Sequence, residues 1–367
     1  MHRPGLGVVS AAGPAAGGVP AAGPAGGAGG GVPAAGGAPA ALPAIVATGS
    51  ALPEQIRTND DPIFDWLREN PQYGQALFTG YSQRRVLGPG ETITAIMVAA
   101  ARAALVAGAV EPSQIDMLLG YGSVGEYITP NTLAQVHGEL GLPASTEVLP
   151  VANDFTNWGS AVVVADALIS AGRIARALIV CGANWTQYVD YHTPQAVSAG
   201  DGAGASILAP VSSPSQWRLV DRQQLTASQD YGAMFMAPDP LPAGGFGPPY
   251  AHITAAGLKD YVVFGENAAP GPVKELLARN GLTPSEVTMI CHQSSITLID
   301  QWQTALPGIT ILQSIETFAN LVSATIPVNL DQLGNQIATD HLVTLGMGVQ
   351  LQAGALLFTR GAVAVAA

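Results

Sequence analysis

Apolar and polar positions along the chain follow helical and strand spacing in alternating blocks. Apolar residues recur at helical spacing from Ile93 to Ala107 and from Pro272 to Arg279. Each predicted helix is followed by an apolar run, Met117 to Gly120 or Met289 to Cys291, as is typical of a buried strand. Strands that alternate with helices predict a mostly parallel sheet covered on both faces.

Other segments extend this pattern. Residues 160–184 predict a buried helix that stops at Gly172, followed by a strand from Ala177 to Cys181. Residues 341–360 predict two strands separated by a glycine turn. The first strand is predicted to begin at Pro43.

The chain contains one internal similarity. Val110–Leu118 recurs as Leu282–Ile290, 172 positions later, and each copy follows a predicted helix and precedes an apolar run. In the second copy, Thr283 is expected to cap a turn, with Pro284 first in it and Glu286 completing a capping box. A Pro-Ser-(Gln/Glu) turn can also arise twice by chance. The alternative is a duplicated α/β unit.

Composition separates a head from the folded part. Residues 1–42 are almost entirely Ala, Gly, Pro and Val, with too few bulky side chains to offset the entropy of ordering, so we expect a disordered head. The predicted organisation is that head, a first half from 43 to 210 and a second half from 211 to 367. These halves are long enough for a substantial core.

Charge and cysteine usage limit the function classes. The net charge of -12 argues against nucleic acid as a partner, and it would also repel an acidic carrier protein. The two cysteines lie in apolar runs, and neither a membrane span nor a signal peptide is apparent. We expect a cytoplasmic protein with no membrane partner and no metal.

Several motifs occur in the order that one family shows. Thr48–Asn59 is similar to an opening strand and turn, and His292-Gln293 with Ile299-Asp300 resembles a His-Gln-Ala-Asn motif. The other matching pieces are Thr79-Gly80 with Arg84 and Arg85, and the glycine-rich Gly200–Ala205. From about Ala44 to Arg360 the chain resembles β-ketoacyl-acyl-carrier-protein synthase III (KAS III) of the thiolase superfamily.

The resemblance implies an α/β thiolase fold, with duplicated α/β halves forming a layered α-β-α-β-α core. Within that fold, the glycine-rich Gly200–Ala205 lacks the Gly-Lys-Ser/Thr ending of a phosphate loop. We therefore expect a tight structural turn there.

The family's chemistry needs a nucleophile and two carbonyl-binding residues. A cysteine at a helix N-terminus accepts an acyl group from a thioester, and a histidine and an asparagine then stabilise the enolate formed by decarboxylation. His292 matches that histidine. Asn320 matches that asparagine, and both are implied to be catalytic.

The nucleophile is where this sequence departs from the family. Alignment of the helix around Val162–Asp166 without gaps places Phe155 at the cysteine position, and a shift by one residue would place Asp154 or Thr156 there. Phe155 cannot be a nucleophile. Asp154 would attack a thioester, act as a base or merely cap the helix, and Thr156 would form an ester if His292 removed its proton.

The two cysteines are poor replacements for the missing thiol. Cys291 is adjacent to His292 on a predicted strand, so the two side chains should point to opposite faces. Cys181 lies in an apolar strand and is expected to be core.

Substrate contacts also differ from the family pattern. Residues 71–78 supply neither the tryptophan nor the arginine that clamp the adenine of coenzyme A in the family, although Tyr73 or Phe78 could stack on a base. Thr297 stands near the position of the basic residue that helps a carrier protein dock.

Three further positions carry expectations. The glycine loop Gly346–Gln350 retains two glycines, so a backbone N–H near Gly348 is expected to serve as an oxyanion donor. Trp158 and Phe155 beside the pocket would favour a short or flat acyl group. The loop Gly125–Pro130, with Thr129 at its tip, resembles the segment that crosses the family's two-fold interface, which implies a dimer.

These observations favour an acyltransferase of specialised, polyketide- or fatty-acid-related metabolism. It would transfer an acyl group from a coenzyme A or carrier-protein thioester to an acceptor without an acyl-cysteine, with His292 as base and no separate cofactor. The alternative is a catalytically silent subunit paired with an active ketosynthase. The first predicts a homodimer and the second a heterodimer. Thioester hydrolysis, and cleavage or cyclisation of a β-keto intermediate, remain open.

Overall fold

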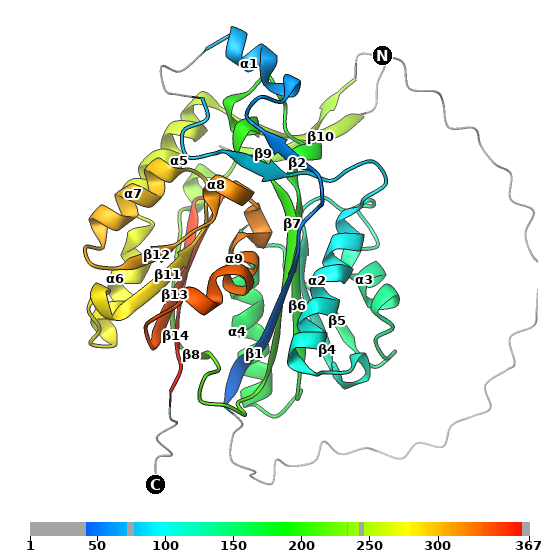
Figure 1. The fold of residues 1–367 in the computed structure, drawn as a ribbon, viewed down its shortest axis with the longest axis vertical. Coiled ribbons are helices and arrows are strands. Elements are labelled where there is room, and N and C mark those ends of the chain that lie inside the picture. The colour runs from blue at the N-terminus through cyan, green and yellow to red at the C-terminus, as the bar shows by residue number, and fades with distance from the viewer. Residues whose placement is uncertain (1–41, 72–76, 154, 233, 242–245, 362–367) are drawn as a thin grey trace, which may run out of the picture. The chain divides into compact units, whose positions relative to one another are not determined.

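The computed structural model describes residues 42–71, 77–153, 155–232, 234–241 and 246–361. Two five-stranded sheets organise this part of the chain, with helices between them and on their outer faces (Figure 1). The predicted head, residues 1–42, lies outside the described residues apart from Leu42.

The first sheet has the strand order β1-β7-β6-β4-β5. Strand β4 is parallel to β5 and β6, whereas β7 is antiparallel to both β6 and β1. The strands are β1 Pro43–Ala51, β4 Met117–Gly122, β5 Glu147–Pro150, β6 Ala177–Asn184 and β7 Asp201–Pro210.

The second sheet repeats this pattern. Its order is β12-β11-β13-β14-β8, with β11 parallel to β12 and β13, and β14 antiparallel to both β13 and β8. Read from the opposite edge, it has the connectivity of the first sheet. The strands are β8 Arg218–Thr226, β11 Val287–Cys291, β12 Thr310–Leu312, β13 His341–Gly348 and β14 Gln352–Thr359. The predicted boundary at 210/211 falls between β7 and β8.

Helices form the remaining layers, and two small two-stranded sheets accompany the five-stranded ones. Helices α4 and α9 lie between the two sheets (Figure 1). The helices are α1 Asp65–Glu69, α2 Ile93–Gly108, α3 Thr132–Leu140, α4 Asn157–Ser170, α5 Ala255–Asn267, α6 Pro270–Arg279, α7 Ile296–Ala305, α8 Ile315–Phe318 and α9 Thr325–Leu333. These small sheets pair β2 Ile56–Thr58 with β3 Gln83–Arg85, and β9 Met234–Pro240 with β10 Phe246–Ile253.

One hydrophobic cluster joins the two sheets through the middle layer. It combines Val162 and Ala165 of α4 with Ile179 of the first sheet and with Leu342 and Phe358 of the second. These side chains are buried, so removal of this apolar surface from water stabilises the packing of α4 on both sheets. The predicted thiolase fold, with its layered duplicated halves, is the observed one.

The internal similarity marks equivalent turns in the two halves. A short 3-10 turn occupies Pro112–Gln114 in the first copy and Pro284–Glu286 in the second, and each has a capping box. In the second, the backbone N–H of Thr283 donates to Glu286 over 2.8 Å. The predicted cap is therefore confirmed, and each turn leads into the equivalent strand, β4 or β11.

The tight turn predicted at Gly200–Ala205 is wrong, because residues 201–210 form strand β7. A side chain at Gly204 would place its Cβ 2.6 Å from the backbone nitrogen of Val328, at the start of α9. The glycine therefore allows the central helix to lie directly on the strand.

The predicted glycine turn near the C-terminus also needs correction. Gly346 and Gly348 lie inside β13, and the turn between β13 and β14 is formed by Val349–Leu351. A Cβ at Gly346 would lie 3.0 Å from the carbonyl oxygen of Phe155, so this glycine permits close packing against the segment before α4.

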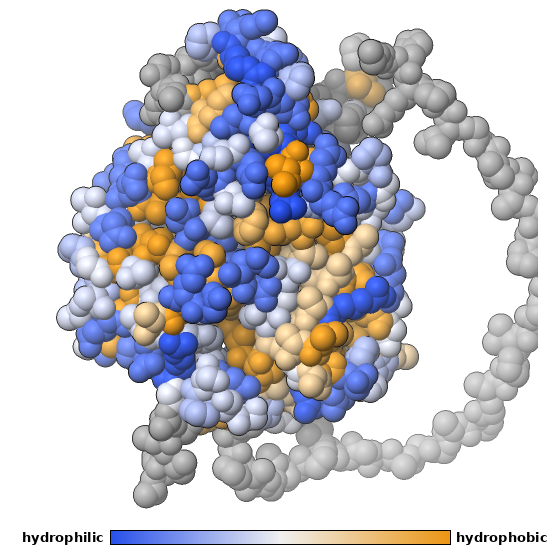
Figure 2. All heavy atoms as spheres, in the orientation of Figure 1, coloured by the Kyte–Doolittle hydropathy of each residue, from blue (hydrophilic) through white to orange (hydrophobic). Residues whose placement is uncertain are grey.

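No helix within the described ranges is long and apolar enough to cross a membrane. On the face of the molecule shown in Figure 2, hydrophilic residues are interspersed with hydrophobic ones.

Candidate active site

Phe155 stands two residues before helix α4, at the position predicted for the lost nucleophile. Its backbone adopts φ 56°, a left-handed conformation that is uncommon for a bulky residue. The next residue, Thr156, is the N-cap of α4, although its hydroxyl does not cap the helix and instead donates to the carbonyl of Asn153 over 2.8 Å. Asp154 lies outside the described residues, so its proposed roles stay predictions.

His292 directly follows strand β11, and its backbone N–H donates to Leu345 of β13 over 2.8 Å. Its side chain is buried, with 1% exposed. Both ring nitrogens lack a hydrogen-bond partner among the described residues. The ring stacks on Phe155, with centroids 5.3 Å apart and planes 8° apart.

This environment determines the charge of the imidazole. Burial disfavours the protonated form and lowers the pKa of His292 to about 3. The ring is therefore neutral at physiological pH. The neutral ring can donate one hydrogen bond and accept another, but it has a low affinity for a further proton.

Asn320 is placed by contacts between the two halves. Its backbone N–H donates to Ser198 of the first half over 2.8 Å, and its side-chain oxygen accepts from the N–H of Val322 over 2.9 Å. The second bond orients the amide, so the NH₂ group of Asn320 remains available as a donor. Ala319, just before it, is held at φ 58°.

A buried amide network supports this turn. The side-chain oxygen of Gln293 accepts from the backbone of Ser314 over 2.6 Å and from Asn329 over 2.8 Å, and its NH₂ group donates to the carbonyl of Ala319 over 3.2 Å. Gln293, the residue after His292, therefore holds Ala319, the residue before Asn320, in place. The His-Gln motif couples two candidate site residues through the core.

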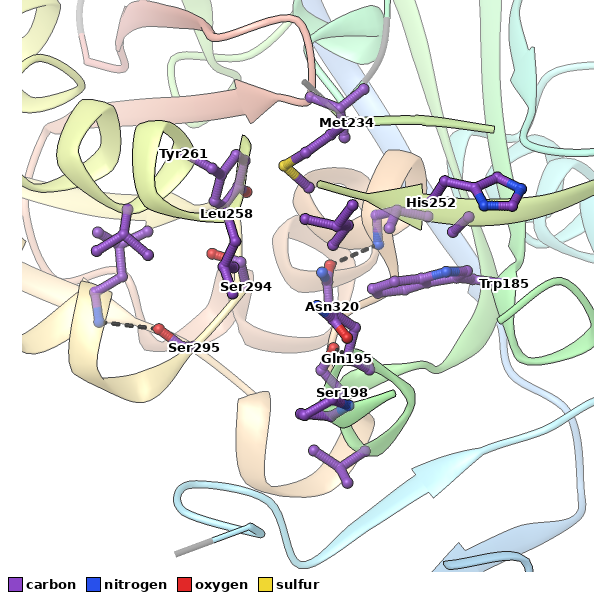
Figure 3. A pocket seen from close by; sticks show the side chains of 18 of the residues that line it. Trp185, Gln195, Ser198, Met234, His252, Leu258, Tyr261, Ser294, Ser295 and Asn320 are labelled. Atoms are coloured by element: carbon purple, nitrogen blue, oxygen red, sulfur yellow. Dashed lines mark hydrogen bonds between the residues drawn. The ribbon is translucent and has the colours of Figure 1, made fainter. Parts of the chain in front are cut away.

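A cavity of about 1420 Å³ opens beside these residues. The hairpin β9–β10 and helices α5 and α7 contribute to its walls, and Figure 3 shows Asn320 facing it together with Trp185, Ser198 and Ser294. Phe155 lines the cavity, whereas His292 does not. The phenyl ring therefore lies between the imidazole and the cavity.

One wall of the cavity carries hydroxyl groups that the sequence analysis did not single out. Tyr81 donates to the carbonyl of Ser294 over 2.7 Å, and burial raises the pKa of both Tyr81 and Tyr261, the latter to about 12. Both phenols are protonated at neutral pH, and the proton of Tyr81 is already donated to Ser294. Ser294 follows His292 by two positions, and this closeness to the motif was the only sequence signal available.

The remaining predicted substrate contacts fall in different places. Phe78 and Thr297 line the cavity. Trp158 does not, because it is buried with 1% exposed and its indole N–H donates to Ser206 over 3.2 Å. Gly348 is buried in β13 and Thr129 lies in an exposed loop, so neither contributes to the cavity wall.

Thr156 and the two cysteines are also away from the cavity wall. The hydroxyl of Thr156 accepts from Gln352 over 2.9 Å, and its side chain is buried. Cys181 and Cys291 are fully buried free thiols, and burial raises the pKa of each to about 12. Neither cysteine therefore forms a thiolate at neutral pH. Tyr73 lies outside the described residues.

Comparison with known proteins agrees with this geometry. Residues 154–226 match the family described as 3-oxoacyl-[acyl-carrier-protein] synthase III, and residues 277–360 match its C-terminal part. The first match includes Phe155, and the second includes His292 and Asn320. The chain is therefore KAS III-like in both halves.

Relatives of this KAS III-like protein cover most of its length. A β-ketoacyl-[acyl-carrier-protein] synthase III from Methylococcus capsulatus is 27% identical, over 76% of this chain and 85% of the relative. A homologue from Streptomyces coelicolor is 25% identical, over 81% of this chain and 92% of its own. These relatives are named as synthases, that is, as enzymes.

Solved structures show the same fold. The priming β-ketosynthase of the R1128 polyketide pathway has a TM-score of 0.76 at 21% identity, covering 88% of this chain and 98% of its own. The synthase III of Pseudomonas aeruginosa has a TM-score of 0.73 at 22% identity, covering 88% and 99%. At this level of identity the likeness extends to the fold of the KAS III-like protein, and its chemistry must be argued from its own residues.

Proposed function

We propose that this protein binds an acyl thioester in the large cavity and transfers the acyl group directly to an acceptor, without an acyl-cysteine. The observation that carries the proposal is the cavity, which is lined by Asn320 and by Phe155, the residue predicted at the nucleophile position. Substrate binding is retained in this proposal, whereas covalent catalysis is lost.

Asn320 has the clearest role in this mechanism. Its amide is oriented by the bond to Val322 and faces the cavity, so it would donate to the thioester carbonyl and stabilise the negative charge that develops there. An acceptor hydroxyl, amine or thiol would attack the same carbon, and the carrier thiol would leave with the proton.

His292 would act as base only after a local change. The ring of Phe155 separates it from the cavity, and a pKa near 3 makes the imidazole a weak proton acceptor. Rotation of Phe155 away from His292 would expose the imidazole to the acceptor. Transfer that depends on His292 would therefore also depend on this movement.

A second candidate function is favoured by the same stacking. If Phe155 remains on His292, the site is closed to chemistry, and the protein would act as a silent subunit that pairs with an active ketosynthase. In that case the self-sufficient homodimer proposed for the transferase would be replaced by a heterodimer.

The experiment follows release of free thiol from acyl-coenzyme A and acyl-carrier-protein substrates, with and without simple acceptors. The wild type is compared with Asn320→Ala and His292→Ala, and Asn335→Ala, at an exposed position away from the cavity, serves as control. Removal of a carbonyl donor should lower the rate about 100-fold or more, with the control unchanged. Release that neither site variant reduces, or no release at all, would contradict the transferase.

A further inference from the structure

The cavity is unusually rich in aromatic side chains. Phe, Tyr and Trp make up 6% of the chain, but about one in five of the residues that line the cavity. Some of these rings are at the exposed rim. Phe235 on β9 stacks on His252 of β10 with centroids 5.0 Å apart, and 42% of Phe235 is exposed.

Two other rings are held deeper, beside Asn320. Phe155 and Trp185 both pack against one hydrophobic cluster, which includes Phe318, Leu321 and Val322. Phe155 is additionally backed by the parallel ring of His292. Figure 3 shows Trp185 extended along the cavity next to Asn320. The segment that orients the carbonyl-binding amide therefore also holds the two rings in place.

This arrangement favours a planar aromatic ligand over a flexible alkyl chain. Aromatic pairs gain free energy beyond the area that they bury, through offset-stacked or edge-to-face contacts, whereas an alkyl chain gains from area alone. Rings that are already fixed lose little entropy when a ligand arrives.

We propose that the acyl group bound in this cavity carries a planar aromatic ring, which packs against Phe155 and Trp185 before any rotation of Phe155, while its thioester carbonyl meets Asn320. This inference rests on the proposed function and specifies its substrate class. The side chain that removed the nucleophile would then form part of the acyl-binding surface.

The test compares two thioesters of the same size. Cinnamoyl-N-acetylcysteamine has an aromatic ring, and 3-cyclohexylacryloyl-N-acetylcysteamine replaces it with a saturated one. Binding is measured by calorimetry and by quenching of tryptophan fluorescence. We expect the aromatic ligand to bind the wild type roughly two- to tenfold more tightly.

Variants assign the preference to the two rings. Phe155→Leu and Trp185→Leu should each reduce the preference, and Trp185→Phe should keep it while losing the fluorescence signal, because Trp185 is the tryptophan that lines the cavity among the described residues. Trp217→Leu is the control, since this indole packs on Arg360 away from the cavity. Thermal melting identifies any variant that fails to fold.

The outcomes separate the two proposals. Equal affinity of the wild type for both ligands, or a preference that survives loss of both rings, would overturn the aromatic class and leave the transferase proposal standing. If neither ligand binds, thioester binding itself is contradicted.

Discussion

The two halves of the fold share one strand order, yet they differ in the chemistry that they bring to their junction. The second half supplies His292 and Asn320, the residues predicted to bind the carbonyl oxygen. The first half supplies Phe155, an apolar ring in a left-handed backbone conformation, at the position predicted for the nucleophile. Both halves have extensive buried cores, so the fold does not require a nucleophilic side chain at Phe155.

The two halves show that buried packing and reactive side chains are separate requirements of the fold and of its chemistry. The ring of Phe155 packs against the hydrophobic cluster around Phe318. It also stacks on His292, whose ring nitrogens have no hydrogen-bond partner among the described residues. A cysteine would fill less of this space but would restore a nucleophile. At this position the protein has an apolar contact and no nucleophilic side chain.

The sharpest test restores the missing group. Phe155→Cys would place a thiol near the N-terminus of α4, where the helix dipole favours a thiolate. We expect an acyl adduct on the introduced thiol after incubation with an acyl thioester, seen by intact-mass spectrometry, and none in the wild type or in Phe155→Ser. Absence of the adduct despite measurable ligand binding would mean that the second half has lost its chemistry too.

A second test uses the pH dependence of stability. The pKa of His292 falls from 6.5 to about 3 on folding, so between these values the unfolded chain binds the proton that the folded chain excludes. Stability is therefore complete above pH 6.5 and falls as the pH drops, by about 1.4 kcal/mol per pH unit, or about 2 kcal/mol at pH 5.

Urea unfolding at pH 7 and pH 5 measures this effect. His292→Leu should remove that share of the pH dependence, whereas His192→Leu, at an exposed position, should keep it. If the free energy of unfolding changes equally between pH 7 and pH 5 in the wild type and in His292→Leu, the imidazole is hydrated or hydrogen-bonded in solution.

A third test examines where the halves pack together. Gly204→Ala would place a Cβ against the backbone of Val328, so β7 and α9 would have to separate. We expect a loss of about 1–3 kcal/mol in the free energy of unfolding. Gly271→Ala is the matched control, because its Cβ would meet nothing within 4 Å. If the two variants lose equal stability, contact between the halves is not the cause.

The smallest expected effect comes from Asp201, the first half's buried carboxylate. Burial raises its pKa from 3.8 to about 6, although Thr186 and Leu87 donate hydrogen bonds to it. The folded chain therefore binds a proton that the unfolded chain releases, and stability rises as the pH falls from 6 toward 4.

This contribution is opposite in sign to that of His292 and amounts to about 1 kcal/mol between pH 6 and pH 5. Asp201→Asn should abolish it in the same unfolding assay, with the exposed Asp190→Asn as reference. If the free energy of unfolding of Asp201→Asn changes with pH as it does in the wild type, the raised pKa of Asp201 is contradicted.

Much of the fold was predictable from local pattern. The helix from Ile93 and the strands at Met117 and Val287 follow their apolar spacing, and the capping box at Thr283 forms as its residues require. These features depend on neighbours a few positions apart, and the sequence displays those neighbours directly. The repeat at Val110 and Leu282 also pointed to the duplicated halves.

The glycine-rich segments differ from the prediction. Gly204 and Gly346 looked like turn residues, but they lie in strands where a helix or a loop from the other half approaches closely. Their role depends on residues more than a hundred positions away, which local pattern does not reveal.

By itself, the sequence indicated the KAS III-like family and the duplicated architecture, and it predicted Phe155, His292 and Asn320 as the residues at the nucleophile, histidine and asparagine positions. Only the tertiary structure decided that Phe155 stacks on His292, that Trp158 is core while Trp185 lines the cavity, and that aromatic rings gather beside Asn320. The physical reason is that burial, ring stacking and the pKa of an imidazole are properties of the surrounding atoms. Those atoms come from both halves and meet only when the sheets pack together.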